Sequence, residues 1–226
     1  MSVTLVRLGR LSAALLSLIL LATSPLRAQS PEYFVGGLLG YQSGAAIQLF
    51  GQANGFAQGL PLPVRVRLGW ASVEPGDAAA ARRVFINNAT NGTPVESGRT
   101  LDLGLEVLHT LGPRTVAYAG IRRTSFRANF KFIGGNEDFD VVSSHWGIAL
   151  GAETSYPMGA RTALMVSGGF ELFKSSRLSG HDTSYSPDGD NANPREEYRY
   201  PDADAAVAQP RLRPALMVGL RYRLGG

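Results

Sequence analysis

In the last stretch of the chain, residues 211–224, apolar residues at every second position alternate with positions that hold Arg, Ala, Met or Gly. Side chains point to opposite faces of a strand with period two, so the pattern predicts a two-faced strand of fourteen residues. An exposed edge strand of this length would pair with other chains, and neither face resembles a fully buried core strand. A closed barrel with lipid outside and polar groups inside accommodates both faces, since only closure satisfies every backbone group in a bilayer. The apolar face comprises Leu212, Pro214, Leu216, Val218, Leu220, Tyr222 and Leu224.

Seven further stretches alternate in the same way, with differing clarity. The alternation is clean where Val64, Val66 and Leu68 oppose Arg65 and Arg67, and it is least decisive in 114–124, which we assign by context. The sequence therefore predicts an all-β fold, an eight-stranded antiparallel up-and-down transmembrane β-barrel. The seven stretches are 33–42, 45–56, 64–70, 100–110, 114–124, 144–156 and 162–174.

The connections between these strands alternate in length. Residues 55–61, 111–113 and 157–160 are short turns, whereas 74–98, 125–141 and 175–209 are long. Only the hairpin at Ser43 and Gly44 is short on the long side. Short turns on one rim, together with both chain ends, and long loops on the other are typical of outer-membrane barrels. Loops of this length would be unusual inside a soluble domain.

The first 28 residues read as a signal peptide, so the barrel is expected over 29–226. Arg7 and Arg10 precede an apolar run over 11–22, and Leu26-Arg27-Ala28 offers a cleavage site. Twelve apolar residues are fewer than the roughly twenty that span a bilayer as a helix. Cleavage would leave 19 of the 22 basic residues against 18 acidic ones, a balance that gives no electrostatic case for nucleic-acid binding. The chain has no Cys, hence no disulfide framework.

Residues 31–226 resemble the eight-stranded outer-membrane β-barrel proteins of Gram-negative bacteria, in the broad OmpA-barrel and OmpX-like class. The alternating strands carry the resemblance, together with the terminal Leu216-x-Val218-x-Leu220-x-Tyr222-x-Leu224. Many relatives end on an aromatic residue, whereas this chain ends Leu224-Gly225-Gly226. The resemblance implies a cell outer-membrane location, contact with outer-membrane lipid and lipopolysaccharide, and a monomer. It indicates little about function.

The inward faces of the predicted strands collect charged side chains of both signs. An eight-stranded barrel is just wide enough for side chains to fill, and paired charges offset each other's desolvation there. We therefore expect a self-paired polar plug arranged in layers; the alternative is a narrow channel for small or hydrophobic solutes. Glu106, Glu153, Arg65 and Arg221 should lie toward the turn rim, and Asp102, Glu171 and Arg213 toward the loop rim, with Arg67 and Arg223 also inward. Trp70, Trp146, Tyr156 and Tyr222 should face lipid.

Three histidines raise the possibility of an outer-leaflet lipid-modifying enzyme, since some small barrels of this class act on acyl chains. His145 has Ser143 and Ser144 beside it, but Ser143 shares its face only if the strand is regular that far. A triad also needs a carboxylate that orients the base, and none is evident. His109 lies near the turn rim and His181 in the last loop. No catalytic residue and no cofactor is assigned.

The last long loop, 175–209, has the most distinctive composition, with seven acidic residues against three Arg. Asp188 and Asp190 are candidates for holding a divalent cation, but Asn193 and Arg199 break the EF-hand template, and a solvated turn-rich loop is the simpler interpretation. Aromatic residues in exposed loops pack together or contact a partner. We expect a non-enzymatic surface protein that acts through its long loops on an unknown partner. These aromatic residues are Tyr185, Tyr198, Tyr200, Phe126, Phe130, Phe132 and Phe139.

Overall fold

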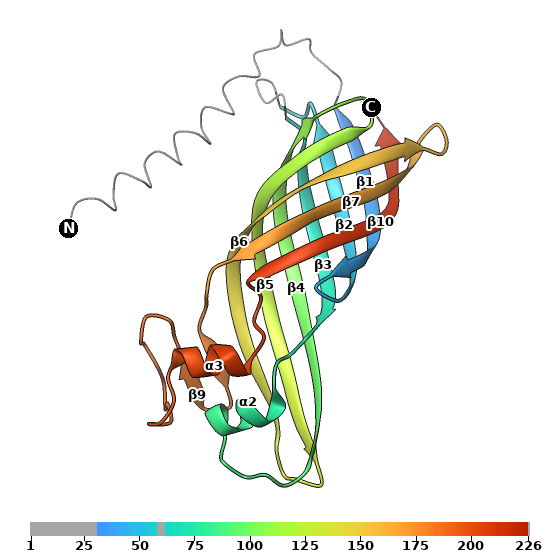
Figure 1. The fold of residues 1–226 in the computed structure, drawn as a ribbon. Helices are drawn as coiled ribbons and strands as arrows, with labels where there is room; N and C mark the ends of the chain where they lie inside the picture. Colours follow the sequence, from blue (N-terminus) through green and yellow to red (C-terminus); the bar gives the residue numbers. More distant parts are fainter. Residues whose placement is uncertain (1–30, 58–61, 226) are drawn as a thin grey trace, which may run out of the picture.

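The structure is a computed structural model that describes residues 31–57 and 62–225. Eight antiparallel strands form a closed barrel, because β1 pairs with both β2 and β10 and the circuit continues through β7, β6, β5, β4 and β3 (Figure 1). The predicted fold class is confirmed. The predicted signal peptide, 1–28, lies outside the described residues. The barrel strands are β1 (Glu32–Gln42), β2 (Ala45–Asn54), β3 (Val64–Val73), β4 (Thr93–Thr110), β5 (Thr115–Ile133), β6 (Asp138–Pro157), β7 (Thr162–Phe173) and β10 (Leu212–Gly225).

Apolar side chains cover the outside of the barrel, as the alternation predicted. Leu101, Leu103 and Leu105 on β4 are exposed, while the residues between them point inward. No helix in the described ranges is long and apolar enough to cross a bilayer. Exposed apolar side chains on every strand form a continuous girdle that is favourable only against lipid. The four aromatic residues expected to face lipid, Trp70, Trp146, Tyr156 and Tyr222, all lie on this outer surface.

The strands β4, β5 and β6 are longer than the sequence predicted. The stretch 125–141, expected to be a loop, is instead a β-hairpin, since β5 runs to Ile133 and β6 begins at Asp138. Only 134–137 form its turn, closed by a hydrogen bond from the Phe132 amide to the Glu137 carbonyl at 2.9 Å. The loop prediction was wrong because alternation continues there with its phase reversed, placing Phe126 and Phe130 inward and Arg127 outward.

The other two long connections also contain regular structure. The stretch 74–98 holds helix α2 (Ala78–Phe85), whose N-cap Asp77 accepts a hydrogen bond from the Ala80 amide, and the start of β4. The stretch 175–209 holds the short strands β8 (Leu178–Gly180) and β9 (Thr183–Tyr185) and helix α3 (Tyr200–Ala206). Strand β8 pairs with β6 through Val141 and Gly180. We call α2, α3, β8, β9 and the protruding parts of β4–β6 the distal cap (Figure 1).

Candidate functional sites: the barrel interior and the distal cap

The first layer of the interior charges lies toward the turn rim. Arg65 on β3 reaches across to Glu153 on β6, with Nη1 donating to Oε2 at 2.6 Å, and lies 3.6 Å from Glu106 on β4. The neighbouring Arg67 donates to the same Glu106 carboxylate at 3.1 Å. All four side chains are buried. Three of the four residues predicted for this layer, Arg65, Glu106 and Glu153, therefore meet here from positions up to 88 apart in the chain.

The second layer lies toward the loop rim and centres on Arg213 of β10. Its guanidinium donates to Asp102 on β4 at 2.8 Å and to Glu171 on β7 at 3.1 Å. Thr100 accepts a third hydrogen bond at 2.9 Å. Arg213 also lies over the ring of Phe173, 4.8 Å from its centroid. A planar guanidinium whose N–H donors are paired with several acceptors in this way is well suited to a dry interior.

Arg122 on β5 joins the two layers, and sequence reasoning did not single it out. Its Nε donates to Glu171 at 2.8 Å, and its Nη2 donates to Glu106. Side chains alternate along a strand, so Arg122 lies on the same inward face as Tyr118, four residues earlier. The outer face of β5 has few large apolar residues, however, and for that reason the strand was assigned only by context. With Arg122 included, four arginines meet four carboxylates, so the network has no net charge.

Arg221 does not join this network, contrary to the prediction. Among the described residues it makes no ion pair, and it lies over the ring of Phe34, 4.8 Å from the centroid. Arg223, also predicted inward, pairs at 3.6 Å with Glu32, with both side chains partly exposed. The physical reason is position: both arginines lie in the final turn-rim segment of β10, where solvent is within reach of a long side chain.

Ser143 and His145 on β6 do share the inward face. Ser143 Oγ lies 2.7 Å from His145 Nε2, and His145 Nδ1 lies 2.9 Å from the carbonyl oxygen of Lys174. A carbonyl accepts only, so Nδ1 carries a proton, and in the neutral imidazole Nε2 then accepts from the serine. That is the tautomer of a general base, but a backbone carbonyl occupies the place of the orienting carboxylate, and both side chains are buried.

Asp188 and Asp190 are each engaged within the last loop. The Asp188 carboxylate accepts from the Ser186 hydroxyl and from the Asp190 amide, and these hydrogen bonds lower the pKa of Asp188. Asp190 pairs with Arg177. Within the described ranges, no three His, Asp or Glu side chains converge as a metal site would need.

The distal cap has a hydrophobic core of its own. Tyr185 lies at its centre, where its hydroxyl donates to the Val84 carbonyl at 3.0 Å and accepts from the Arg195 amide at 3.0 Å. The aromatic residues that seemed exposed in sequence are therefore mostly packed against each other, with Tyr198 and Tyr200 at the margin. The core comprises Ala78, Ala81, Val84, Phe85, Phe126, Ala128, Phe130, Phe132, Phe139, Val141, Leu178, Tyr185, Ala203, Ala206 and Val207.

An ion pair fastens α2 to the tip of the hairpin. Arg82 contacts Glu137 at 2.5 Å and lies over the ring of Phe132, 4.4 Å from its centroid. Hydrogen bonds from Arg82 and Asn87 lower the pKa of Glu137 to about 2. The Arg82 guanidinium also donates to the Asn91 carbonyl at 2.7 Å. The connection between α2 and β4 is thus tied to the β5–β6 hairpin by polar contacts as well as by the core.

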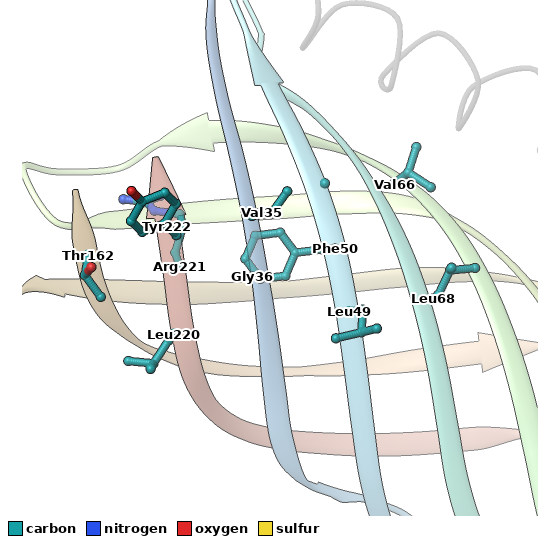
Figure 2. A pocket seen from close by; sticks show the side chains of 11 residues that line it. Val35, Gly36, Leu49, Phe50, Val66, Leu68, Thr162, Leu220, Arg221 and Tyr222 are labelled. Carbon is teal, nitrogen blue, oxygen red and sulfur yellow. The ribbon is translucent and has the colours of Figure 1, made fainter. Parts of the chain in front are cut away.

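A hollow of about 620 Å³ lies on the lipid-facing side of the barrel, not in its lumen (Figure 2). Val35, Leu49 and Val66 line it from adjacent strands. It opens at Gly51, where an added Cβ would meet no atom within 4 Å. An apolar furrow inside the girdle is filled by lipid acyl chains in a bilayer, so it needs no separate ligand.

Comparison with solved structures finds the same fold elsewhere. A major outer-membrane protein from Thermus thermophilus matches with a TM-score of 0.70 and 23% identity, over 87% of this chain and all of that one. Neisserial surface protein A matches at a TM-score of 0.40 and 12% identity, over 87% of this chain and 99% of that one. No protein-family model and no curated protein matches the chain.

The first of these likenesses is one of fold, because its sequence identity is low. Two further observations agree with this likeness of fold. The eight strands form a closed circuit, and exposed apolar side chains form a girdle around it. A girdle of this kind places the barrel in the outer membrane, as the sequence resemblance implied. The chain has the fold of the eight-stranded outer-membrane β-barrel proteins.

Proposed function

We propose that this outer-membrane barrel is a non-enzymatic surface protein whose working part is the distal cap. The observation that carries the proposal is the cap core, since connections that merely span strands do not need fifteen buried apolar residues. Most barrel residues, by contrast, are accounted for by the girdle and the interior network. A rigid body held above a barrel presents fixed side chains at little cost in ordering entropy.

The 175–209 segment of the cap is acidic, with seven acidic residues against three Arg. Asp182 and Glu196 are exposed, and their carboxylates receive no hydrogen bond from the cap core. The Asp182 carboxylate lies 3.3 Å from the ring of His181, which is itself exposed. The packed aromatic residues, which first suggested a partner, are not available for contact. Charge complementarity therefore favours a partner with positive charge at its own surface.

The test is complementation of a deletion strain. Asp182→Asn with Glu196→Gln changes the cap surface without removing a core contact, so the variant should fold and still fail to restore the envelope or adhesion phenotype of the strain. Glu32→Gln, at the opposite rim, is the matched control and should restore it. If the cap variant complements as well as wild type, the proposal fails and a structural role for the barrel becomes the better account.

The competing activity is acyl hydrolysis by Ser143 and His145, which the 2.7 Å contact and the tautomer favour. A fluorophosphonate probe tests it directly, because it labels a serine that an adjacent base activates. We expect no labelling of Ser143, since its side chain is buried and its histidine lacks a carboxylate. Labelling that disappears in His145→Ala would establish an enzyme instead.

A further inference from the structure

Three arginines lie on the outer surface where the girdle ends at the loop rim. Arg99 on β4 is paired directly with Arg127 on β5, and Arg123 lies lower on β5, toward the girdle. All three are exposed, and the residues beside them in each strand point into the barrel. Like charges directly opposite each other in a ladder repel, so the arrangement needs negative charge beside it, of which Asp140 supplies one unit for two paired arginines.

A polar cleft of about 360 Å³ surrounds two of these arginines. Arg99 and Arg127 line it together with Ser72, Ser97 and Asp140, and Trp70 is also part of its lining. It exists because β3 leaves the sheet at this level. The last β3–β4 pair is Val73 with Gly98, and a Cβ on Gly98 would lie 2.4 Å from the Val73 carbonyl oxygen. Beyond that point no strand of the described residues pairs with β4 on this side.

The charges in the cleft are unequally satisfied. Asp140 pairs with Arg127, and this contact lowers the pKa of Asp140, so the carboxylate is ionised at neutral pH. Arg99 makes no ion pair within the described part of the chain. One guanidinium is therefore left over, with the hydroxyls of Ser72 and Ser97 beside it as further donors.

The position of the cleft indicates which anion is at hand. Trp70 and Leu101 lie just below Arg99 on the outer surface. Arg123 lies 5.2 Å from the ring centroid of Trp146. Aromatic side chains at the end of a girdle mark the depth of the lipid headgroups. A guanidinium fork matches two phosphate oxygens, and the headgroup layer supplies phosphate at high local concentration.

We propose that this cleft binds the phosphate group of an anionic lipid in the leaflet at the loop rim. Arg99 is the principal ligand and forms the forked contact. Arg127, shared with Asp140, and the two serines complete the site, while the acyl chains lie against Trp70 and the girdle. This inference goes beyond the proposed cap function and stands or falls independently of it.

Quenching of Trp70 fluorescence tests the site. The chain has two tryptophans, so Trp146→Phe leaves Trp70 as the only reporter and keeps an aromatic ring beside Arg123. The protein is reconstituted in phosphatidylcholine vesicles with brominated phosphatidic acid or brominated phosphatidylcholine at equal mole fraction. Brominated phosphatidic acid should quench Trp70 more strongly. Arg99→Gln should reduce that preference about three- to tenfold, the effect of one charge-assisted hydrogen bond at a hydrated interface.

Matched variants keep the result interpretable. Arg161→Gln removes the same charge at the opposite rim and should leave the preference unchanged. Heat-modifiable gel migration checks that each variant is folded. If Arg99→Gln does not assemble, Arg99→Lys replaces it in the test, because it keeps the charge and loses the forked contact. Equal quenching by the two lipids in the parent protein, or full preference in Arg99→Gln, would overturn the proposal. Loss of the preference in excess inorganic phosphate would also overturn it, by identifying a phosphate site without lipid specificity.

Discussion

Arg65 and Glu153 face each other across the barrel interior, and neither side chain has any exposed surface. Two charges buried together offset each other's desolvation, whereas one left alone bears the whole cost. Gln52 adds a hydrogen bond to the Arg65 guanidinium at 2.7 Å, and the ring of Phe50 lies 4.6 Å from it. The arginine is thus held on several sides, so its position does not depend on Glu153 alone. Glu106 lies 3.6 Å from it as well, but Glu153 supplies one of the four negative charges that balance the four arginines of the network.

Glu153→Ala should therefore lower the free energy of unfolding by about 3–5 kcal/mol, because it leaves four buried arginines with three carboxylates. Urea unfolding in detergent micelles, followed by tryptophan fluorescence, measures the change. The control is Glu32→Ala, which removes the partly exposed partner of Arg223 and should cost at most about 1 kcal/mol. Equal effects of the two substitutions would show that the interior pair is hydrated.

The contact between Arg82 and Glu137 should make the cap sensitive to acid. The pKa of Glu137 is lowered from 4.5 to about 2 in the folded protein, so its contribution to stability is complete above pH 4.5 and disappears as the pH falls through 2. Amide-exchange protection factors for residues 82–91 and 132–137 should therefore be lower at pH 3 than at pH 6. Glu137→Gln should narrow that difference, and an unchanged difference would contradict the assignment.

At the scale of elements, β5 explains what the sequence could and could not predict. Its lower half places Ile121 outward against lipid, and its upper half places Phe126 and Phe130 inward against the cap. The outer face of β5 meets lipid along its lower half and water along its upper half. The apolar residues therefore move from the outer face to the inner face along the strand, while the period stays at two. We interpreted that reversal as the end of the strand. The eight strands and their rims were predictable because the girdle imposes one phase on all of them.

The cap itself was not predictable from local pattern. The contact between Tyr185 and Val84 joins residues 101 positions apart, and such packing depends on where the barrel strands hold each loop. A local signal for α2 was present, however: Asp77 precedes Ala78, Ala80 and Ala81, an N-cap followed by good helix formers. In the interior, seven of the nine predicted charged residues belong to the network, whereas Arg221 and Arg223 were included on alternation alone, without regard to their distance from the rim.

Tyr185→Phe should loosen the cap without opening the barrel. The substitution keeps the ring and removes one donor and one acceptor, leaving the Val84 carbonyl and the Arg195 amide without their partner, at a cost of about 1–3 kcal/mol. Limited proteolysis should then cut the 175–209 segment faster, while heat-modifiable migration stays as in wild type. Tyr33→Phe, on the outer surface of β1, is the control. Loss of heat-modifiable migration would show instead that cap and barrel fold as one unit.

At the scale of the whole molecule, the barrel has one tall wall and one short one (Figure 1). Strands β4, β5 and β6 contain 18, 19 and 20 residues, whereas β1, β2 and β3 contain 11, 10 and 10. The cap helices α2 and α3 lie on the inward side of the tall wall, where their apolar residues share one core with Phe126 and Phe130. The asymmetry gives the molecule a sheltered apolar face for the cap and, on the opposite side of the same wall, the polar cleft with Arg99.

The same view of the whole molecule predicts that the barrel does not conduct as a porin does. Ion pairs cross the lumen from β3 to β6 and from β4 to β10, and Arg122 links them, so a solute would have to break buried pairs to pass. Folded wild-type protein in planar bilayers should therefore show no stable conductance steps of porin size. Glu106→Ala with Glu171→Ala removes both partners of Arg122 and should raise conductance above wild type if the barrel still migrates as folded. Glu32→Gln, at the partly exposed partner of Arg223, should leave the conductance as in wild type. Large, stable conductance steps from wild-type protein would contradict the plug and favour a channel.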